Sequence, residues 1–179
     1  MSVVSRRGLA GLLTLFGLHT AQAAGLDVGQ PAPGFTLNDQ AGNSVRLDDY
    51  RGRWVVLYFY PKDDTPGCTT EACNFRDDLP TLRKMNVQIL GVSLDDSASH
   101  AQFAEKYRLP FPLLTDGTGE VTRRYESLTS FGPFKFAKRQ TFLIDPEGRI
   151  AKIYRDVKAS THSREIQQDL KALLQSPGT

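Results

Sequence analysis

The fold is decided at residues 54–73, where the apolar run Trp-Val-Val-Leu-Tyr-Phe-Tyr leads into Pro-Lys-Asp-Asp-Thr-Pro-Gly-Cys-Thr-Thr-Glu-Ala-Cys. An uninterrupted apolar run such as 54–60 is typical of a central strand buried on both faces. Behind the loop at 61–67, apolar side chains recur at helical spacing. They are Ala72, Phe75, Leu79 and Leu82. We therefore expect a buried strand, a loop and a helix, with Cys68 where the helix begins.

The position of Cys68 favours reactivity. Proteins of the α/β class place their sites at the carboxyl ends of parallel strands. A helix N-terminus has unpaired N–H groups and a partial positive charge, and both stabilise a thiolate. Because the thiolate rather than the thiol is the nucleophile, this position predicts a nucleophilic cysteine.

The second cysteine, Cys73, follows five residues later. Two cysteines in an exported protein usually form a structural disulfide. Along an intact helix, however, five residues separate the Cα atoms by about 8.6 Å, whereas a disulfide needs about 7 Å or less. Two alternatives remain. Either the segment is not helical, or the bond forms only after the first turn unwinds, as in a catalytic cycle.

The rest of the chain predicts the elements around this unit. Expected strands are 35–37 with 44–47 as a hairpin, 87–94, 111–114, and a second hairpin of 140–145 with 149–154. Expected helices are 97–107, 119–125 and a final amphipathic one with Ile166, Leu170 and Leu173. Pro80 should kink or restart the helix that contains it. This order gives an α/β thioredoxin-like fold, a mixed central sheet flanked by helices.

The pattern Pro61-x-x-x-Thr65-x-x-Cys68 matches the active-site signature of peroxiredoxins, and the string at 60–73 closely resembles the peroxiredoxin Q, or bacterioferritin comigratory protein, subfamily. The resemblance covers about residues 29–174. It implies an antioxidant, thiol-dependent peroxidase that reduces hydrogen peroxide and organic hydroperoxides. It further implies a monomer without cofactor or metal, re-reduced by a thioredoxin-like or other thiol reductant.

The resemblance also implies roles within the motif. Cys68 would be the peroxidatic thiolate, and Cys73 would be the resolving cysteine, which gives an intrachain disulfide. Thr65 would hydrogen-bond the thiolate and the peroxide oxygens, and Pro61 would shield the sulfur from water. The backbone N–H groups of Gly67 and Cys68 would hold the peroxide. If Pro61 and Thr65 were ordinary turn residues, their fixed spacing to Cys68 would be unexplained.

Outside the motif, Arg139 aligns with the active-site arginine of the subfamily. A fixed donor of this kind would stabilise the negative charge on the departing oxygen. The alternative is a solvated surface arginine next to Lys138. Glu71 would orient the arginine through a charged pair, or else it is an acid of the first helical turn that favours the helix dipole. Both interpretations of Glu71 remain open.

Residues 125–138 depart from the usual subfamily pattern and precede Arg139. Three aromatic side chains in this stretch are candidates to contact an apolar hydroperoxide tail. They are Phe131, Phe134 and Phe136. We favour the other interpretation, that they pack against the sheet, because burial is the common fate of such residues.

The balance of charge bears on the partners. Of the 22 basic residues, two lie in the first 23 positions, which contain no acid, so the remaining 20 balance the 20 acidic residues. A neutral body argues against nucleic acid or a membrane surface as a partner.

The first 23 residues resemble a signal peptide. Paired arginines at 6–7 are followed by an apolar stretch at 9–18 and by the small-x-small site Ala-Gln-Ala at 21–23. The apolar stretch is about half the roughly 20 residues needed to span a bilayer. We expect cleavage after Ala23, export to the periplasm by the Sec or the twin-arginine route, and one domain at 24–179.

Two rival functions share the fold. A thiol–disulfide exchange protein has Cys-x-x-Cys, whereas four residues separate Cys68 from Cys73. A copper-delivery protein would hold Cu(I) with two thiolates and a histidine, for which His162 is the candidate, but metal binding leaves Thr65 unexplained. Otherwise we expect His162 at a helix start and His100 on a helix surface.

Overall fold

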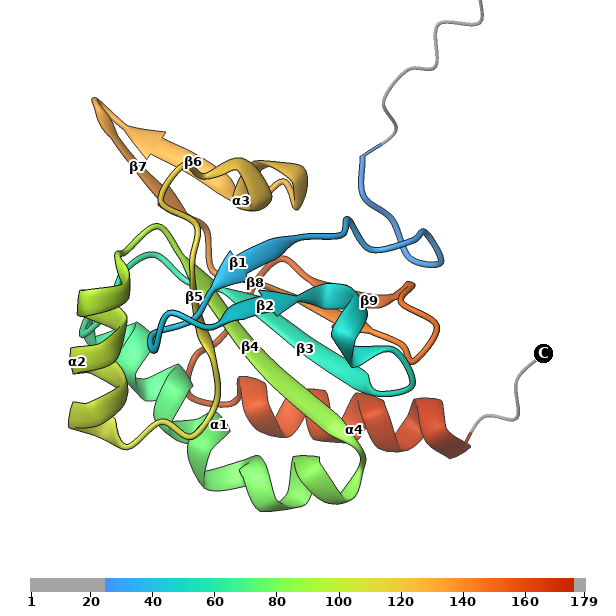
Figure 1. Cartoon of the computed structure of the whole chain (residues 1–179). Coiled ribbons are helices and arrows are strands. Elements are labelled where there is room, and N and C mark those ends of the chain that lie inside the picture. Colours follow the sequence, from blue (N-terminus) through green and yellow to red (C-terminus); the bar gives the residue numbers. More distant parts are fainter. Residues whose placement is uncertain (1–24, 176–179) are drawn as a thin grey trace, which may run out of the picture.

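A seven-stranded mixed sheet forms the centre of the structure, in the order β2-β1-β5-β4-β3-β8-β9 (Figure 1). The computed structural model describes residues 25–175, so the expected leader lies outside the described residues. The strands are β1 (Thr36–Asn38), β2 (Ser44–Arg46), β3 (Trp54–Phe59), β4 (Val87–Ser93), β5 (Leu113–Thr115), β6 (Leu128–Phe131), β7 (Phe134–Ala137), β8 (Gln140–Ile144) and β9 (Ile150–Tyr154). The helices are η1 (Leu47–Tyr50), α1 (Pro66–Lys84), α2 (Ser97–Tyr107), α3 (Glu120–Arg124) and α4 (His162–Gln175).

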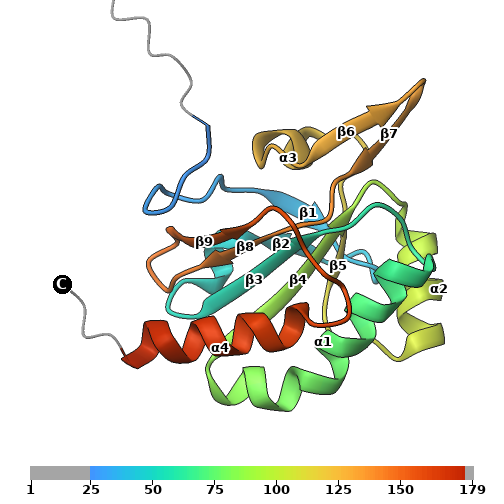
Figure 2. The same cartoon turned by 180° about the vertical axis from the view of Figure 1, so that it is seen from behind.

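The strand β3 organises this sheet. It runs parallel to β4 and antiparallel to β8, so it lies inside the sheet as its apolar run predicted. Its side chains alternate between two cores. Val56 and Tyr58 pack in one core with residues of α1, α2 and α4. Val55 and Leu57 pack in the other with residues of β2 and α3. Figures 1 and 2 show α1 and α4 together on one side of the sheet.

The helix α1 follows β3 and carries both cysteines. It runs without a break from Pro66 to Lys84, so the expected restart at Pro80 was wrong. Pro80 has no N–H to donate to the preceding turn, and the ribbon changes direction along its length, which agrees with a kink (Figures 1 and 2). The four apolar side chains at helical spacing are all buried, as predicted. Among residues 25–175, no helix has the length and apolar character to cross a membrane.

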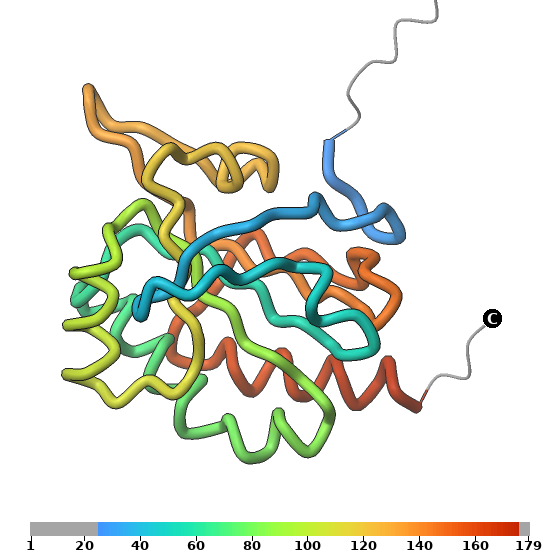
Figure 3. Tube along the Cα trace, viewed as in Figure 1, coloured from blue at the N-terminus to red at the C-terminus, as the bar shows by residue number. Residues whose placement is uncertain are grey.

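A second sheet of two strands stands where no strand was expected. β6 and β7 form a hairpin that projects from the body (Figures 1 and 3). Gly132 and Pro133 make its turn, with Gly132 at a φ of 58°, in the left-handed region that glycine favours. Phe131 and Phe134 lie opposite each other and are 79% and 72% exposed, so the expectation that they pack against the main sheet was wrong. Phe136 is half-buried.

Candidate active site

Cys68 lies in the first turn of α1, just beyond the carboxyl end of β3, and is buried. Thr65 is the N-cap residue of this helix, but its side chain makes no capping hydrogen bond. The Thr65 hydroxyl instead donates to the backbone carbonyl of Lys62 at 3.0 Å. Within residues 25–175, no backbone carbonyl or side chain accepts from the N–H groups of Gly67 and Cys68. Two backbone donors therefore remain open at the start of the helix.

Arg139 approaches the sulfur from the neighbouring strand. It directly precedes β8, and the β8 register sets Gln140 opposite Phe59, at the end of β3. The Arg139 Nη2 donates to Cys68 Sγ at 3.2 Å, and its Nη1 donates to Glu71 Oε2. A guanidinium hydrogen bond of this kind stabilises a thiolate. Arg139 is half-buried in the site rather than a solvated surface residue.

Glu71 holds the other edge of this guanidinium. It is the sixth residue of α1, beyond the first turn, and its side chain is buried. The contact with Arg139 favours the charged-pair interpretation over that of a first-turn acid. Burial raises the pKa of Glu71 to about 7, against the lowering influence of Arg139. Gly67 leaves room for the arginine, since a Cβ there would lie 3.1 Å from Arg139 Nη2.

The loop between β3 and α1 is fixed by a buried carboxylate that the sequence did not reveal. Asp63 accepts hydrogen bonds from the hydroxyls of Tyr60, at 2.8 Å, and Ser99, at 2.7 Å. His100 Nδ1 lies 2.8 Å from the same carboxylate. Burial opposes ionisation of Asp63, but the hydrogen bonds from His100, Ser99 and Tyr60 hold its pKa below the usual value. His100 is fully buried, so its expected place on a helix surface was wrong.

The next residue gives the loop a second attachment. Asp64 has a φ of 55°, a left-handed conformation that aspartate adopts more readily than most residues. Its carboxylate accepts from Lys106 Nζ at 2.6 Å and from the Tyr107 hydroxyl at 2.5 Å. Asp63 and Asp64 thus tie the loop to the first turn and to the last turn of α2. This holds Thr65 and the start of α1 in position.

Cys73 lies further along the unbroken α1 and is half-buried, and both cysteines are free. The non-helical alternative for residues 68–73 is therefore wrong for this state. Beyond Cys73, three side-chain contacts tie α1 to its neighbours. They are Asn74 Nδ2 to the carbonyl of Ala159 (3.0 Å), Arg76 Nη1 to the carbonyl of Tyr107 (2.7 Å) and Ser163 Oγ to Asp78 (2.7 Å).

A hollow of about 670 Å³ adjoins the motif. Pro61 and Lys62 form one wall and the hairpin strand β7 another. The lining residues are Pro61, Lys62, Leu94, Asp95, Phe134, Lys135 and Phe136. Its volume is within the range of sites for small organic ligands. Of the three aromatic residues considered as contacts for a hydroperoxide tail, Phe134 and Phe136 lie here and Phe131 does not.

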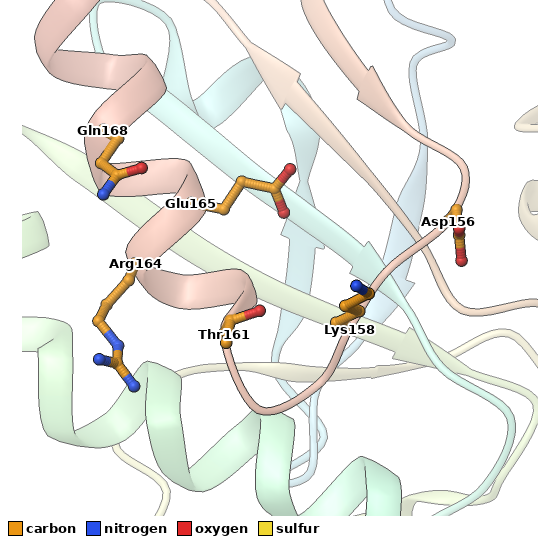
Figure 4. Close-up of a pocket in the computed structure, with 6 residues that line it drawn as sticks. All are labelled: Asp156, Lys158, Thr161, Arg164, Glu165 and Gln168. Carbon is orange, nitrogen blue, oxygen red and sulfur yellow. The ribbon is translucent and has the colours of Figure 1, made fainter.

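Figure 4 shows a different hollow, of about 470 Å³, between α4 and the loop before it. In this view Glu165 points toward the loop and Arg164 points away from it. The hollow contains none of the predicted site residues. His162 is the first residue of α4, as expected, and is buried with its ring nitrogens next to Thr141 and Glu165. No cluster of three or more His, Cys, Asp or Glu side chains within 25–175 could hold a metal, so the copper alternative lacks a ligand set there.

Comparison with known proteins shows which family this chain is similar to. The pattern of the AhpC/TSA family matches residues 28–153. Peroxiredoxin Bcp of Bacillus subtilis is 44% identical over 150 residues, which make up 82% of this chain and 96% of that protein. The identical residues therefore extend well beyond the motif that carries the cysteines.

Solved structures give the same result. A cysteine-to-serine mutant of PrxQ from Xylella fastidiosa has a TM-score of 0.80 at 33% identity, covering 85% of this chain and 99% of that one. The bacterioferritin comigratory protein of Xanthomonas campestris, studied for alkyl peroxide reduction, has a TM-score of 0.76 at 35% identity, covering 82% of this chain and 99% of that one. The predicted thioredoxin-like architecture is confirmed.

Proposed function

This chain belongs to the AhpC/TSA family and is a thiol-dependent peroxidase of the peroxiredoxin Q type, and on that premise we propose that Cys68 is its peroxidatic cysteine and Cys73 its resolving cysteine. One observation carries the proposal. The Arg139 guanidinium donates to Cys68 Sγ, at 3.2 Å, at a helix start whose backbone donors are open. A thiolate there has a fixed positive partner, and the open N–H groups can donate to a bound peroxide.

The first step is a displacement at oxygen. The Cys68 thiolate attacks the terminal oxygen of a hydroperoxide R–O–O–H. An S–O bond forms as the O–O bond breaks, and the electron pair leaves on RO⁻, which takes a proton from solvent to become ROH. The sulfur is left as a sulfenic acid. Arg139 and the N–H groups of Gly67 and Cys68 stabilise the charge that develops on the departing oxygen.

The second step converts the sulfenic acid to a disulfide, and reduction of that disulfide then regenerates both thiols. Cys73 attacks the sulfenic sulfur of Cys68, an S–S bond forms and water leaves. An external dithiol, either a thioredoxin-like protein or another thiol, then reduces this intrachain disulfide by exchange. Because α1 is helical through both cysteines, the second step requires its first turns to unwind.

Thr65 and Pro61 do not exchange electrons with the substrate. Thr65 positions the peroxide, and Pro61 shields the sulfur from water. The hydroxyl proton of Thr65 is directed to Lys62, so its oxygen offers lone pairs to the O–H of the hydroperoxide. This differs from the expectation that Thr65 donates to the thiolate. Pro61 is half-buried on the wall of the adjoining hollow, and its ring keeps water from the sulfur.

The hollow favours organic hydroperoxides as substrates beside hydrogen peroxide. Phe134, Phe136 and Leu94 give it an apolar lining next to Pro61. The Xanthomonas relative was studied for alkyl peroxide reduction. An alkyl group attached to the peroxide would leave water for this lining, which lowers the free energy of the bound substrate.

We also propose that the protein works outside the cytoplasm. The charged start, the short apolar stretch and Ala-Gln-Ala at 21–23 support removal of residues 1–23. N-terminal sequencing of the protein recovered from the periplasm should begin at Ala24. A chain that still begins at Met1 in the cytoplasm would contradict export.

A sulfenic-acid reagent tests the assignment directly. The reduced full chain receives one equivalent of peroxide in the presence of the reagent, and peptides are mapped by mass spectrometry. Label on Cys68 and none on Cys73 is expected. Label on Cys73 alone, or no peroxide consumption with any thiol reductant, would refute the assignment.

A further inference from the structure

The tip of the β6–β7 hairpin exposes two aromatic rings on neighbouring strands. Phe131 and Phe134 are directly opposed and are 79% and 72% exposed. The other exposed large apolar residues in 25–175 are Val28, Leu173 and Leu174, and none of these lies on the hairpin. Figures 1 and 2 show that the tip extends beyond the rest of the fold. Paired exposed aromatic rings on a projecting turn mark a contact surface.

The segment that carries this tip is basic. Residues 123–138, here called the basic segment, contain four basic residues and one acidic residue, a net charge of +3. The basic residues are Arg123, Arg124, Lys135 and Lys138, and all four are exposed. The acidic residue, Glu126, accepts from Arg155 and from the N–H of Leu26. The chain after residue 23 is neutral, so this segment, which carries the exposed rings, has a local excess of positive charge.

We propose that the hairpin tip docks on an anionic lipid surface, with Phe131 and Phe134 in the interface and the basic segment against the headgroups. Aromatic rings with adjacent lysines form the combination that binds such surfaces. Each cation near an anionic leaflet strengthens the attraction. The expectation of no membrane partner was drawn from the net charge of the whole body, which hides this local excess.

A second copy of the chain is a poorer occupant of this surface. A twofold contact through the tip would bring one basic segment against the same segment of the partner. Like charges that meet across an interface are destabilising. An anionic surface instead neutralises the segment.

Docking would also orient the site. Phe134 and Lys135 line the hollow whose opposite wall is Pro61 and Lys62. A bilayer against the tip would therefore lie beside this hollow. The proposal concerns binding alone and goes beyond the peroxidase function, so the two can fail separately.

Vesicle binding tests the proposal. The purified full chain is sedimented with vesicles of phosphatidylcholine alone, or with about one-third phosphatidylglycerol. Binding to the anionic vesicles is expected, and high salt should weaken it. Phe131→Ser should weaken binding about tenfold, because one ring then leaves the interface. Leu174→Ser removes an exposed apolar side chain away from the hairpin, at a residue that is 53% exposed, and should have no effect. Equal loss in the two variants would overturn the proposal.

A charge reversal and a depth probe sharpen the test. Lys138→Glu should weaken binding several-fold at low salt, whereas Lys171→Glu, at an exposed position of α4, should not. In Phe131→Trp the indole emission should shift to the blue on adding anionic vesicles. An unchanged emission would refute lipid docking. Binding that requires a protein partner, or that results from self-association of the chain, would also refute it. Hydrogen peroxide consumption by Phe131→Ser without vesicles should equal that of the parent, which separates this result from any failure of the proposed function.

Discussion

The two halves of α1 are attached to the protein in different ways. The first half, residues 66–73, begins without a side-chain cap, contains both cysteines and is contacted by Arg139. The second half, 74–84, is tied to the 159–163 segment and to the end of α2 by three side-chain hydrogen bonds. Local opening costs least where few contacts oppose it. The difference assigns the redox change to the first half and the attachment of the helix to the second.

The largest expected effect is on the two cysteines of the first half. Cys68→Ser should abolish peroxide reduction, because a serine hydroxyl is not ionised at neutral pH. Cys73→Ser should still consume one equivalent of peroxide and then stall as a sulfenic acid or over-oxidise. Stopped-flow peroxide consumption with reductant and without it separates the two outcomes. Full turnover by Cys68→Ser would show that the first half is not the reactive part.

The next effect concerns the contact that reaches the first half from β8. Arg139→Lys removes the paired donors that join Cys68 and Glu71, and we expect the rate of peroxide reduction to fall about a hundredfold. Lys138→Ala is the matched control. Lys138 precedes Arg139 in the sequence, and its exposed side chain makes no contact with Cys68. Equal rates for Arg139→Lys and the parent in a single-turnover assay would show that Arg139 does not assist peroxide reduction.

A pH effect distinguishes Glu71 from the other carboxylates. In the folded protein the pKa of Glu71 is about 7, which is above its ordinary value of 4.5. Between pH 4.5 and pH 7 the folded protein therefore holds a proton that the unfolded chain has released. This contribution to stability is present below pH 4.5 and is lost as the pH rises toward 7. Glu71→Gln lacks the titrating group. Denaturant unfolding should therefore show the parent losing stability relative to Glu71→Gln between these two values. A constant difference would contradict the raised pKa.

The smallest expected effect tests the second half. Asn74→Ala removes the hydrogen bond to Ala159, and the free energy of unfolding should fall by about 1 kcal/mol. Thr70→Ala is the control from the first half, since the Thr70 hydroxyl only donates to Pro66 within the same helix. Denaturant titrations of both variants measure the effect. A larger loss for Thr70→Ala would mean that the first half carries the attachment.

The sequence revealed the parts of this site that are contiguous. The end of a buried strand, the loop and the start of a helix all fall within residues 54–73, where apolar periodicity reports them. Arg139 is remote in sequence and was found through the resemblance of its surroundings. Its approach to Cys68 depends on the antiparallel pairing of β3 with β8, which a hairpin signal at 140–154 does not specify.

Other parts depend on tertiary packing and left no local signal. Asp63 and His100 are 37 residues apart, and they meet only because α2 packs over the loop. His100 on an expected helix resembled an ordinary surface residue. The β6–β7 hairpin was missed because its strands are short and pair only with each other, so no apolar face marks them.

Amide hydrogen exchange in the two redox states tests the central claim most directly. The reduced protein and the protein oxidised with one equivalent of peroxide are compared residue by residue, and a non-reducing gel checks that the oxidised form keeps monomer size. Oxidation should speed exchange from Gly67 to about Cys73, while residues 74–84 stay protected by their anchors. Identical exchange in both states, or loss of protection along the whole of α1, would contradict the account.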